Sequence, residues 1–333
     1  MALRGRVYYC INAVYTDDNL DMSHAPGVPQ PPSDEQIDPS KPILVLIHAA
    51  TSSSHSFIYQ FRDPRMRAAF NLVSHDTRFY GWTLSKPLDR YMTLEERADE
   101  TMDLLDAVIG DKPYMILGES FAGAQCALYI AAKRPQQVKG MVLVSPSFIT
   151  DPPEMCEILE QQWAPLCAQN KFGNGDGTGR LPDEAMAIVR DYFFSGSTHE
   201  PERQEAFLKQ YQEQHGWNLD LFNVNQLLYW FRRKAPPPEI FQAIRVPVLL
   251  LGGTCDTAVN PEDALNDWYK VLENVPEDKK RIERIQGGSH FLATTSANLV
   301  NRFILTFFSR HGLITPPTPV QSPPLSPFAA PSA

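Results

Sequence analysis

The chain has 333 residues, of which 43% are hydrophobic, so it can bury one large core or a core with an added subdomain. Its formal net charge is −9, from 30 basic and 39 acidic residues, and no dense run of Lys and Arg occurs. This charge balance argues against nucleic acid or an anionic membrane surface as a partner.

The cysteine content and the absence of long apolar runs indicate the cellular compartment in which we expect the protein. Five cysteines are an odd number, and none are in Cys-x-x-Cys spacing, which argues against a disulfide framework and favours a reducing environment. The first residues lack the apolar run of a secretion signal, and no stretch approaches about 18 uninterrupted apolar residues. We therefore expect a soluble, cytoplasmic protein.

Short apolar, β-branched runs alternate with stretches of helical spacing. Such runs are typical of parallel strands covered on both faces, so the alternation predicts a mostly parallel α/β sheet with functional loops at the carboxyl ends of its strands. Thr93 and Glu96 have the spacing of a helix N-terminal capping box. The expected strands are 6–14, 43–47, 69–75, 114–117, 138–144, 246–251 and 281–285, and the expected helices are 93–109, 124–133, 261–271 and 293–308.

The alternation stops at residues 151–240, which we interpret as a helical cap inserted between core segments 1–150 and 241–312. Its many aromatic residues are suited to line an apolar substrate pocket, although a cap also needs such residues for its own core. The glycine-rich run 173–179 fits neither a calcium loop nor a phosphate loop, so we expect a surface loop. Residues 313–333 contain seven prolines and no charge, which predicts a disordered tail.

Ser120 is the best candidate nucleophile, because it lies between an apolar run and a stretch of helical spacing. Small residues on both sides allow a sharp turn that exposes the hydroxyl and leaves backbone amides near its oxygen. The segment reads Gly118-Glu119-Ser120-Phe121-Ala122-Gly123.

A serine hydroxyl needs a base within hydrogen-bond reach and a group that orients the base. His290 is the expected base, since it follows Gly287 and Gly288 in a loop after the last expected strand. Asp256, which follows strand 246–251, is the expected orienting carboxylate. Asp151, after strand 138–144, is the alternative acid.

The oxyanion of a tetrahedral intermediate needs two backbone donors. Phe121 N–H, directly after the nucleophile, is the first candidate. Ala50 N–H, in the loop after strand 43–47, is the second, and Ala49 N–H is its alternative.

These motifs resemble the α/β-hydrolase superfamily over roughly residues 1–312. Asp256 and the Ser120 turn belong to the resemblance, with Ala49 and Ala122 standing where the family usually has glycine. The remaining matching segments are His48-Ala49-Ala50, Gly288-Ser289-His290 and Asp76-Thr77-Arg78-Phe79-Tyr80-Gly81.

The resemblance implies a core sheet of about eight strands with a helical lid inserted after the sixth. It also implies acyl transfer through Ser120 on a small carboxylic ester, lactone or thioester, without a cofactor or a metal. Candidate substrate-binding residues are His48, Tyr192, Phe193 and Trp230. Three alternatives remain open: an acyltransferase, a hydrolase of C–C bonds, and a non-catalytic receptor for a small ligand. The oligomeric state is not determined by the sequence.

Overall fold

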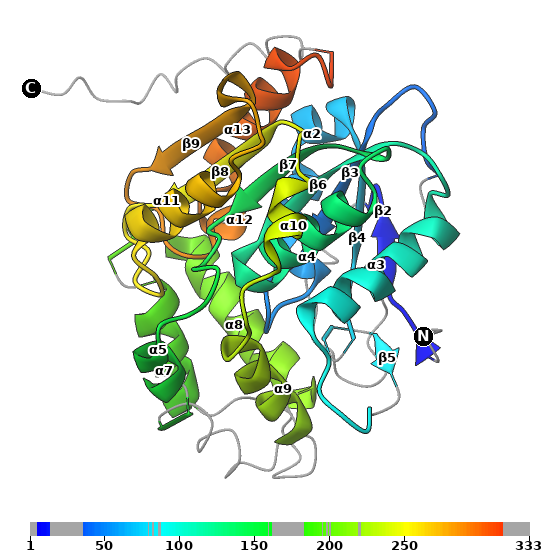
Figure 1. Ribbon diagram of the computed structural model, residues 1–333. Helices are drawn as coiled ribbons and strands as arrows, with labels where there is room; N and C mark the ends of the chain where they lie inside the picture. The colour runs from blue at the N-terminus through cyan, green and yellow to red at the C-terminus, as the bar shows by residue number, and fades with distance from the viewer. Residues whose placement is uncertain are drawn as a thin grey trace, which may run out of the picture.

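The computed structural model describes residues 5–13, 36–78, 80–81, 83–85, 88–158, 160–161, 183–194, 196–197, 199, 201–218 and 221–315. A seven-stranded sheet lies at the centre of these residues, with helices on both faces (Figure 1). Its strand order is β2 (Tyr9–Ile11), β4 (Asn71–His75), β3 (Ile43–Ile47), β6 (Tyr114–Glu119), β7 (Val138–Val144), β8 (Val248–Gly253) and β9 (Lys280–Ile285).

The sheet is parallel except at one edge, where β2 pairs antiparallel with β4. The mostly parallel α/β architecture is thus confirmed, whereas the described residues place seven strands, and not eight, in this sheet. The expected first strand is divided, because β1 (Gly5–Arg6) leaves the main sheet and pairs antiparallel with β5 (Leu84–Ser85).

Each central strand supplies side chains to two separate cores. In β3, Val45 packs into the core on one face, together with helices α3 (Leu94–Val108) and α4 (Ser120–Lys133). Leu44 packs into the core on the other face with α13 (Ala297–Arg310). Burial on both faces explains the uninterrupted apolar sequence of β3, since neither set of alternating side chains meets water.

Most helices lie where the sequence predicts them. The Thr93 side chain accepts a hydrogen bond from Glu96 N–H while the Glu96 carboxylate accepts one from Thr93 N–H, which confirms the capping box of α3. The expected last helix is interrupted at Ser296, so that it forms two helices. The remaining core helices are α1 (Ile58–Arg62), α2 (Pro64–Ala69), α10 (Pro238–Gln242), α11 (Pro261–Val271) and α12 (Leu292–Thr295).

Among the described residues, four further helices lie between β7 and β8 in the chain and gather on one side of the sheet in Figure 1. We call them the cap helices: α5 (Pro153–Ile158), α7 (Asp183–Phe194), α8 (Pro201–Asn218) and α9 (Leu221–Phe231). The predicted loop 173–179 lies outside the described residues, as does the predicted tail from residue 316 onward. No described helix combines the length and the apolar composition needed to span a membrane.

Candidate functional site

Ser120 occupies a sharp junction at which β6 passes directly into α4. Its φ of 57° lies in the left-handed region, which non-glycine residues rarely adopt and which is typical of strained functional turns. The junction needs glycine on both sides. A Cβ on Gly118 would overlap Gly123 O, and a Cβ on Gly123 would lie 2.5 Å from Ile47 O. The small residues predicted from the sequence are therefore required by contact between backbones.

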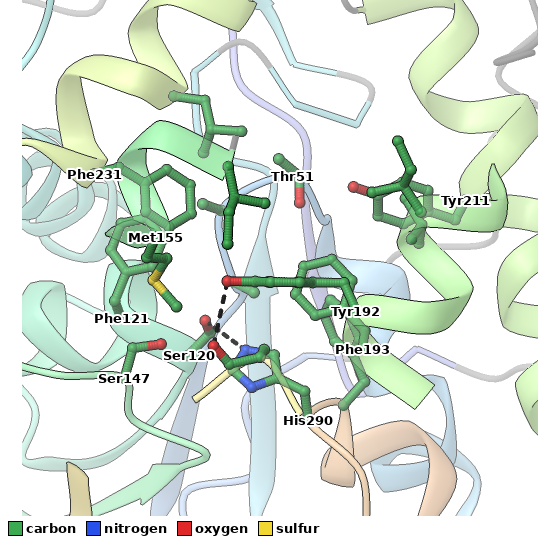
Figure 2. A pocket seen from close by; sticks show the side chains of 18 residues that line it. Thr51, Ser120, Phe121, Ser147, Met155, Tyr192, Phe193, Tyr211, Phe231 and His290 are labelled. Atoms are coloured by element: carbon green, nitrogen blue, oxygen red, sulfur yellow. Dashed lines mark hydrogen bonds between the residues drawn. The ribbon is translucent and has the colours of Figure 1, made fainter. Parts of the chain in front are cut away.

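The structure brings the side chains of Ser120, His290 and Asp256 together, and Figure 2 shows the first two of them. Ser120 Oγ lies 3.0 Å from His290 Nε2, and His290 Nδ1 lies 2.7 Å from Asp256 Oδ2. Because the Asp256 carboxylate only accepts, Nδ1 carries the proton and Nε2 accepts the hydrogen bond that the Ser120 hydroxyl donates. The three side chains thus have the geometry of a nucleophile, a base and an orienting acid.

The cap helix α7 holds the two loops that carry His290 and Asp256. His290 N–H donates to Phe193 O at 3.2 Å, and Thr257 Oγ1 donates to Tyr192 O at 2.8 Å. Asp256 is fixed further within its own loop, because its Oδ1 accepts the N–H of Ala258 at 3.0 Å. The end of one cap helix therefore sets the separation between base and acid.

The charges around His290 favour its protonated form. Burial lowers the pKa of the imidazole, but the facing Asp256 carboxylate raises it, with a smaller contribution from Asp151, and the net pKa is raised above 6.5. A raised pKa makes the imidazole a stronger base toward the Ser120 hydroxyl.

Asp151, the alternative acid, is engaged elsewhere. Its carboxylate forms an ion pair with both terminal nitrogens of Arg233, and the two side chains are 0% and 6% exposed. The guanidinium of Arg233 also donates to Phe148 O and lies 4.4 Å from the ring centre of Phe121. Asp151 therefore fastens the segment after α9 to the loop after β7, and the geometry favours Asp256 as the partner of His290.

The candidate oxyanion residues lie beside Ser120. Ala49, Ala50 and Phe121 all line the same cavity as the Ser120 hydroxyl. Thr51, which follows them, has a φ of 56°, a conformation that is strained for a β-branched residue. Such strain persists only where surrounding contacts impose it, so the backbone path of this loop is strictly determined.

A largely apolar cavity opens above Ser120, with about 710 Å³ of empty space that includes its opening to solvent (Figure 2). His290 is the one lining residue with a titratable group near neutral pH, and no Asp, Glu, Lys or Arg is among the described residues that line it. The cavity walls are Ala49, Ala50, Thr51, Ser120, Phe121, Ser147, Met155, Ile158, Ile188, Val189, Tyr192, Phe193, Tyr211, Leu227, Phe231, Ala258, His290 and Phe291.

Two of the four predicted substrate-binding residues line this cavity, and two do not. Tyr192 and Phe193 belong to its wall, and the Phe193 ring lies 5.3 Å from the His290 ring. His48 is fully buried outside it, because its Nε2 accepts Thr77 N–H at 3.0 Å. Trp230 is 1% exposed, and its Nε1–H donates to Met92 O at 2.6 Å. The structure therefore places His48 and Trp230 outside the cavity wall, where their polar atoms bind backbone groups.

The sequence interpretation missed several wall residues on the cap helices. Ile188 and Val189 of α7 line the cavity, and so do Tyr192 and Phe193, each four residues later. One face of this helix therefore lines the cavity. That helical spacing is visible in the sequence and would have identified the face. Among the described residues, no three His, Cys, Asp or Glu side chains are grouped as metal ligands would be.

The sequence interpretation also assigned no role to Glu119, which is buried directly before the nucleophile. Neither carboxyl oxygen makes a hydrogen bond of good geometry with a described residue. Burial raises the pKa of this carboxyl to about 8, and the charge of His290 and the nearby Ala293 N–H and Ser56 hydroxyl oppose that rise only in part. Glu119 is therefore mostly protonated at neutral pH.

Comparison with known proteins identifies the fold family. A family described by the alpha/beta hydrolase fold matches residues 42–296. No curated protein matches the sequence.

Solved structures share this fold at low sequence identity. An enol-lactonase from Burkholderia xenovorans LB400 has a TM-score of 0.65 at 16% identity, over 93% of this chain and 99% of its own. A thermophilic esterase from Thermogutta terrifontis has a TM-score of 0.59 at 17% identity, over 81% and 90%. A bromoperoxidase from Bacillus anthracis has a TM-score of 0.64 at 18% identity, over 81% and 92%. Since the family match covers more than half of the chain, the protein belongs to the α/β-hydrolase family.

Proposed function

We propose that the protein is a serine hydrolase that cleaves a carboxylic ester, lactone or thioester of a small, largely apolar molecule through an acyl-Ser120 intermediate. The observation that carries this proposal is the unbroken hydrogen-bond sequence from Asp256 through His290 to Ser120, which ends in an apolar cavity. A nucleophile, its base and its orienting acid are all present in the geometry that acyl transfer requires.

The reaction begins when Ser120 Oγ attacks the substrate carbonyl and transfers its proton to His290 Nε2. Asp256 stabilises the imidazolium that forms, because its carboxylate already accepts Nδ1–H. Phe121 N–H and Ala50 N–H donate to the oxyanion, and each such donor contributes about 3 kcal/mol to transition-state stabilisation. His290 returns the proton to the leaving group, and a water molecule activated by the same imidazole then releases the acid.

The cavity favours a neutral substrate. A carboxylate or phosphate group placed there would lose its hydration without gaining a cationic partner, since no described lining residue is a Lys or Arg. The Met155, Ile188 and Leu227 side chains offer apolar contacts to an acyl or alcohol chain. The structural similarity to an esterase and an enol-lactonase agrees with ester or lactone chemistry.

A fluorophosphonate probe tests the proposal, because it labels only a serine that a base has activated. We expect labelling of the native protein and none of Ser120→Ala or His290→Ala. Ser147→Ala is the matched control, since its hydroxyl lines the same cavity without a hydrogen bond to His290, and it should still be labelled. A folded native protein without labelling would favour the non-catalytic receptor instead.

Acyl transfer and C–C bond hydrolysis use the same three side chains, so labelling does not distinguish them from ester hydrolysis. Product analysis with water and an alcohol or amine acceptor in competition does. We expect the free acid as the main product. A dominant ester or amide product would identify a transferase.

A further inference from the structure

Arg97 of helix α3 is a buried cation without a carboxylate partner among the described residues. Its side chain lies on the helix face that carries Leu94, Ala98 and Leu105 into the core, and the residue is 1% exposed. Its Nε and Nη1 make no hydrogen bond within the described chain. Leaving a charge unpaired in the core is costly, so the position of Arg97 needs an explanation beyond stability.

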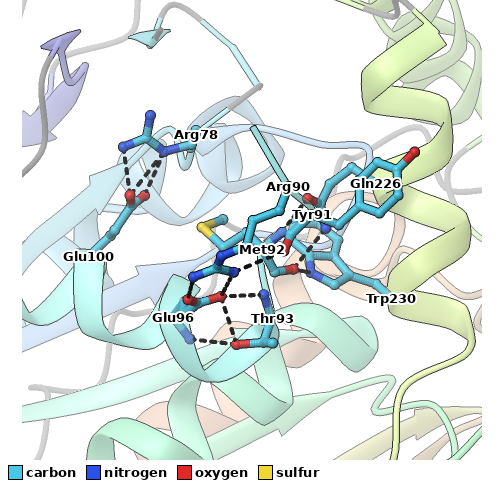
Figure 3. A network of polar contacts seen from close by, with 9 residues as sticks. All are labelled: Arg78, Arg90, Tyr91, Met92, Thr93, Glu96, Glu100, Gln226 and Trp230. Atoms are coloured by element: carbon cyan, nitrogen blue, oxygen red, sulfur yellow. Dashed lines mark hydrogen bonds and ion pairs between the residues drawn. The ribbon is translucent and has the colours of Figure 1, made fainter. Parts of the chain in front are cut away.

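The neighbouring arginine, Arg78, shows the usual arrangement for comparison. Its guanidinium forms a bidentate ion pair with Glu100 of the same helix α3 (Figure 3). Around Arg97, in contrast, the ionisable neighbours are Cys126, Tyr80 and His75. Burial raises the pKa of Cys126 and Tyr80 and lowers the pKa of His75. All three are therefore neutral at pH 7, and they do not compensate the positive charge of Arg97.

The one side-chain hydrogen bond that Arg97 makes to a described residue goes to the loop that carries the candidate donors Ala49 and Ala50. Its Nη2 donates to His48 O at 2.8 Å. That carbonyl belongs to the peptide unit whose N–H is that of Ala49. A charge-assisted hydrogen bond to the carbonyl holds this peptide unit in place and polarises its N–H.

The next peptide unit is held in the same way by the His48 ring. Thr77 N–H donates to His48 Nε2, so Nε2 is unprotonated and Nδ1 carries the proton. His48 Nδ1–H then donates to Ala49 O at 2.7 Å. This second carbonyl belongs to the peptide unit whose N–H is that of Ala50. Both candidate amides of this loop, Ala49 N–H and Ala50 N–H, thus belong to peptide units whose carbonyl oxygens are bound by side chains that do not line the cavity.

The cap contacts the same arginine through Trp230 of helix α9. The Arg97 guanidinium carbon lies 5.5 Å from the centre of the Trp230 ring. Helix α9 is fixed at this point, because Trp230 Nε1–H and the Gln226 amide both donate to Met92 O while Gln226 Oε1 accepts Met92 N–H (Figure 3). Trp230 therefore supplies the aromatic face on which the buried cation rests.

We propose that Arg97 is a positioning residue for the loop of Ala49 and Ala50. Arg97 holds and polarises the His48–Ala49 peptide unit, and the Trp230 ring of the cap packs against its guanidinium. This inference rests on the proposed serine hydrolase function. A cation that is hydrogen-bonded to the carbonyl end of a donor peptide unit favours the transition state over the ground state, whereas a residue that only packs would affect both states equally.

The test compares Arg97→Met, which removes the charge and keeps much of the side-chain length, with Arg97→Lys, which keeps the charge. The readouts are kcat and KM for a neutral 4-nitrophenyl ester, and the inhibition constants of an aryl trifluoromethyl ketone and of the matching methyl ketone. The trifluoromethyl ketone adds to the serine and forms an oxyanion, whereas the methyl ketone binds without this adduct.

We expect Arg97→Met to lower kcat by about tenfold to a hundredfold with little change in KM, because it frees the loop that carries Ala50 N–H and the alternative donor Ala49 N–H without removing either amide. Binding of the trifluoromethyl ketone should weaken by a similar factor, and binding of the methyl ketone by less than about twofold. Arg97→Lys should recover part of the loss. Arg78→Met is the matched control, and its ratio of the two inhibition constants should equal that of the native protein.

Equal weakening of both ketones by Arg97→Met, or kcat within about twofold of native, would overturn the inference. If Arg97→Met does not fold, Arg97→Lys and Trp230→Phe decide, since each should change the ratio of the two inhibition constants in the same direction, and a native ratio in both variants overturns the proposal. A native protein that fluorophosphonate does not label overturns the serine hydrolase function as well. Labelled native protein with unchanged variants overturns only the role of Arg97.

Discussion

Asp151 and Arg233 form an ion pair in which both side chains are almost fully buried. The pair joins the loop after β7 to the segment after the cap helix α9. The charge of Asp151 is balanced by Arg233, which also contacts Phe148 O and the Phe121 ring, and Asp151 raises the pKa of His290 less than Asp256 does. Two carboxylates near one histidine therefore have separate partners, and their removal has separate consequences.

Asp256→Asn should reduce kcat/KM by about a thousandfold to ten-thousandfold, because the amide favours the wrong tautomer of His290. Asp151→Asn should reduce kcat/KM far less, but it leaves the buried Arg233 without its partner and should lower the free energy of unfolding by about 3–5 kcal/mol. Steady-state kinetics and urea unfolding of both variants measure these effects. Equal losses of activity, or the reverse order, would refute the assignment of Asp256.

The activity should depend on the protonation of His290. Its Nε2 must be unprotonated to accept the Ser120 proton, and its pKa is raised above 6.5 by Asp256. We therefore expect kcat/KM for a neutral ester to fall as the pH decreases through a value above 6.5. In Asp256→Asn the residual activity should persist to lower pH, since the variant removes the largest contribution that opposes the effect of burial on the pKa of His290. An acid limb that does not move in this variant would contradict the assigned pair.

Glu119→Gln should stabilise the protein at alkaline pH. The carboxyl of Glu119 has a pKa of about 8 in the folded protein, against 4.5 for the ordinary value, so folding retains a proton between these pH values. The contribution of Glu119 to stability is therefore lost as the pH rises from 4.5 to 8. Glutamine does not ionise, so the free energy of unfolding of the variant relative to native should increase across this window, on the order of a few kcal/mol.

Urea unfolding at pH 5 and pH 8 measures this effect of Glu119→Gln. A constant difference between variant and native at both pH values would mean that the buried carboxyl keeps its ordinary pKa.

Met155→Trp should narrow the apolar cavity on the side of cap helix α5. Added side-chain volume leaves less room for a long acyl chain, whereas an acetyl group stays close to Ser120. We expect the ratio of kcat/KM for an octanoyl ester to that for an acetyl ester to fall at least about tenfold. A ratio equal to that of the native protein would show that the chain of the substrate does not occupy this side.

The parts of the fold that depend on neighbouring residues were predictable. The apolar run of β3 coincides with the expected strand 43–47, and helix α11 begins and ends where the sequence predicts. The capping box of α3 was identified from Thr93 and Glu96 alone, because its hydrogen bonds join residues three positions apart. Helix α4 begins at Ser120, four residues before the predicted start, since a single residue with positive φ makes the turn that was expected to need several.

The side-chain directions at the site were not predictable to the same degree. His48 belongs to the oxyanion motif and was expected to bind substrate, yet it does not line the cavity. Its Nε2 accepts a hydrogen bond from Thr77 N–H, which follows the neighbouring strand β4. Trp230 is one of many aromatic residues in the cap, and its buried position depends on contacts with Met92 O and Arg97, which are distant in the sequence. Arg97 gave one signal in the sequence, a charge on the apolar face of a helix.

The sequence by itself determined the strand-turn-helix that presents Ser120, the family, and the order in which Asp256 and His290 follow, because each depends on residue types within a short segment. The tertiary structure decided which carboxylate orients His290, which aromatic residues line the cavity, and what supports the loop of Ala49 and Ala50. These features depend on backbone groups from distant segments that come into contact only when the sheet and the cap are assembled. No local sequence pattern predicts such long-range contacts.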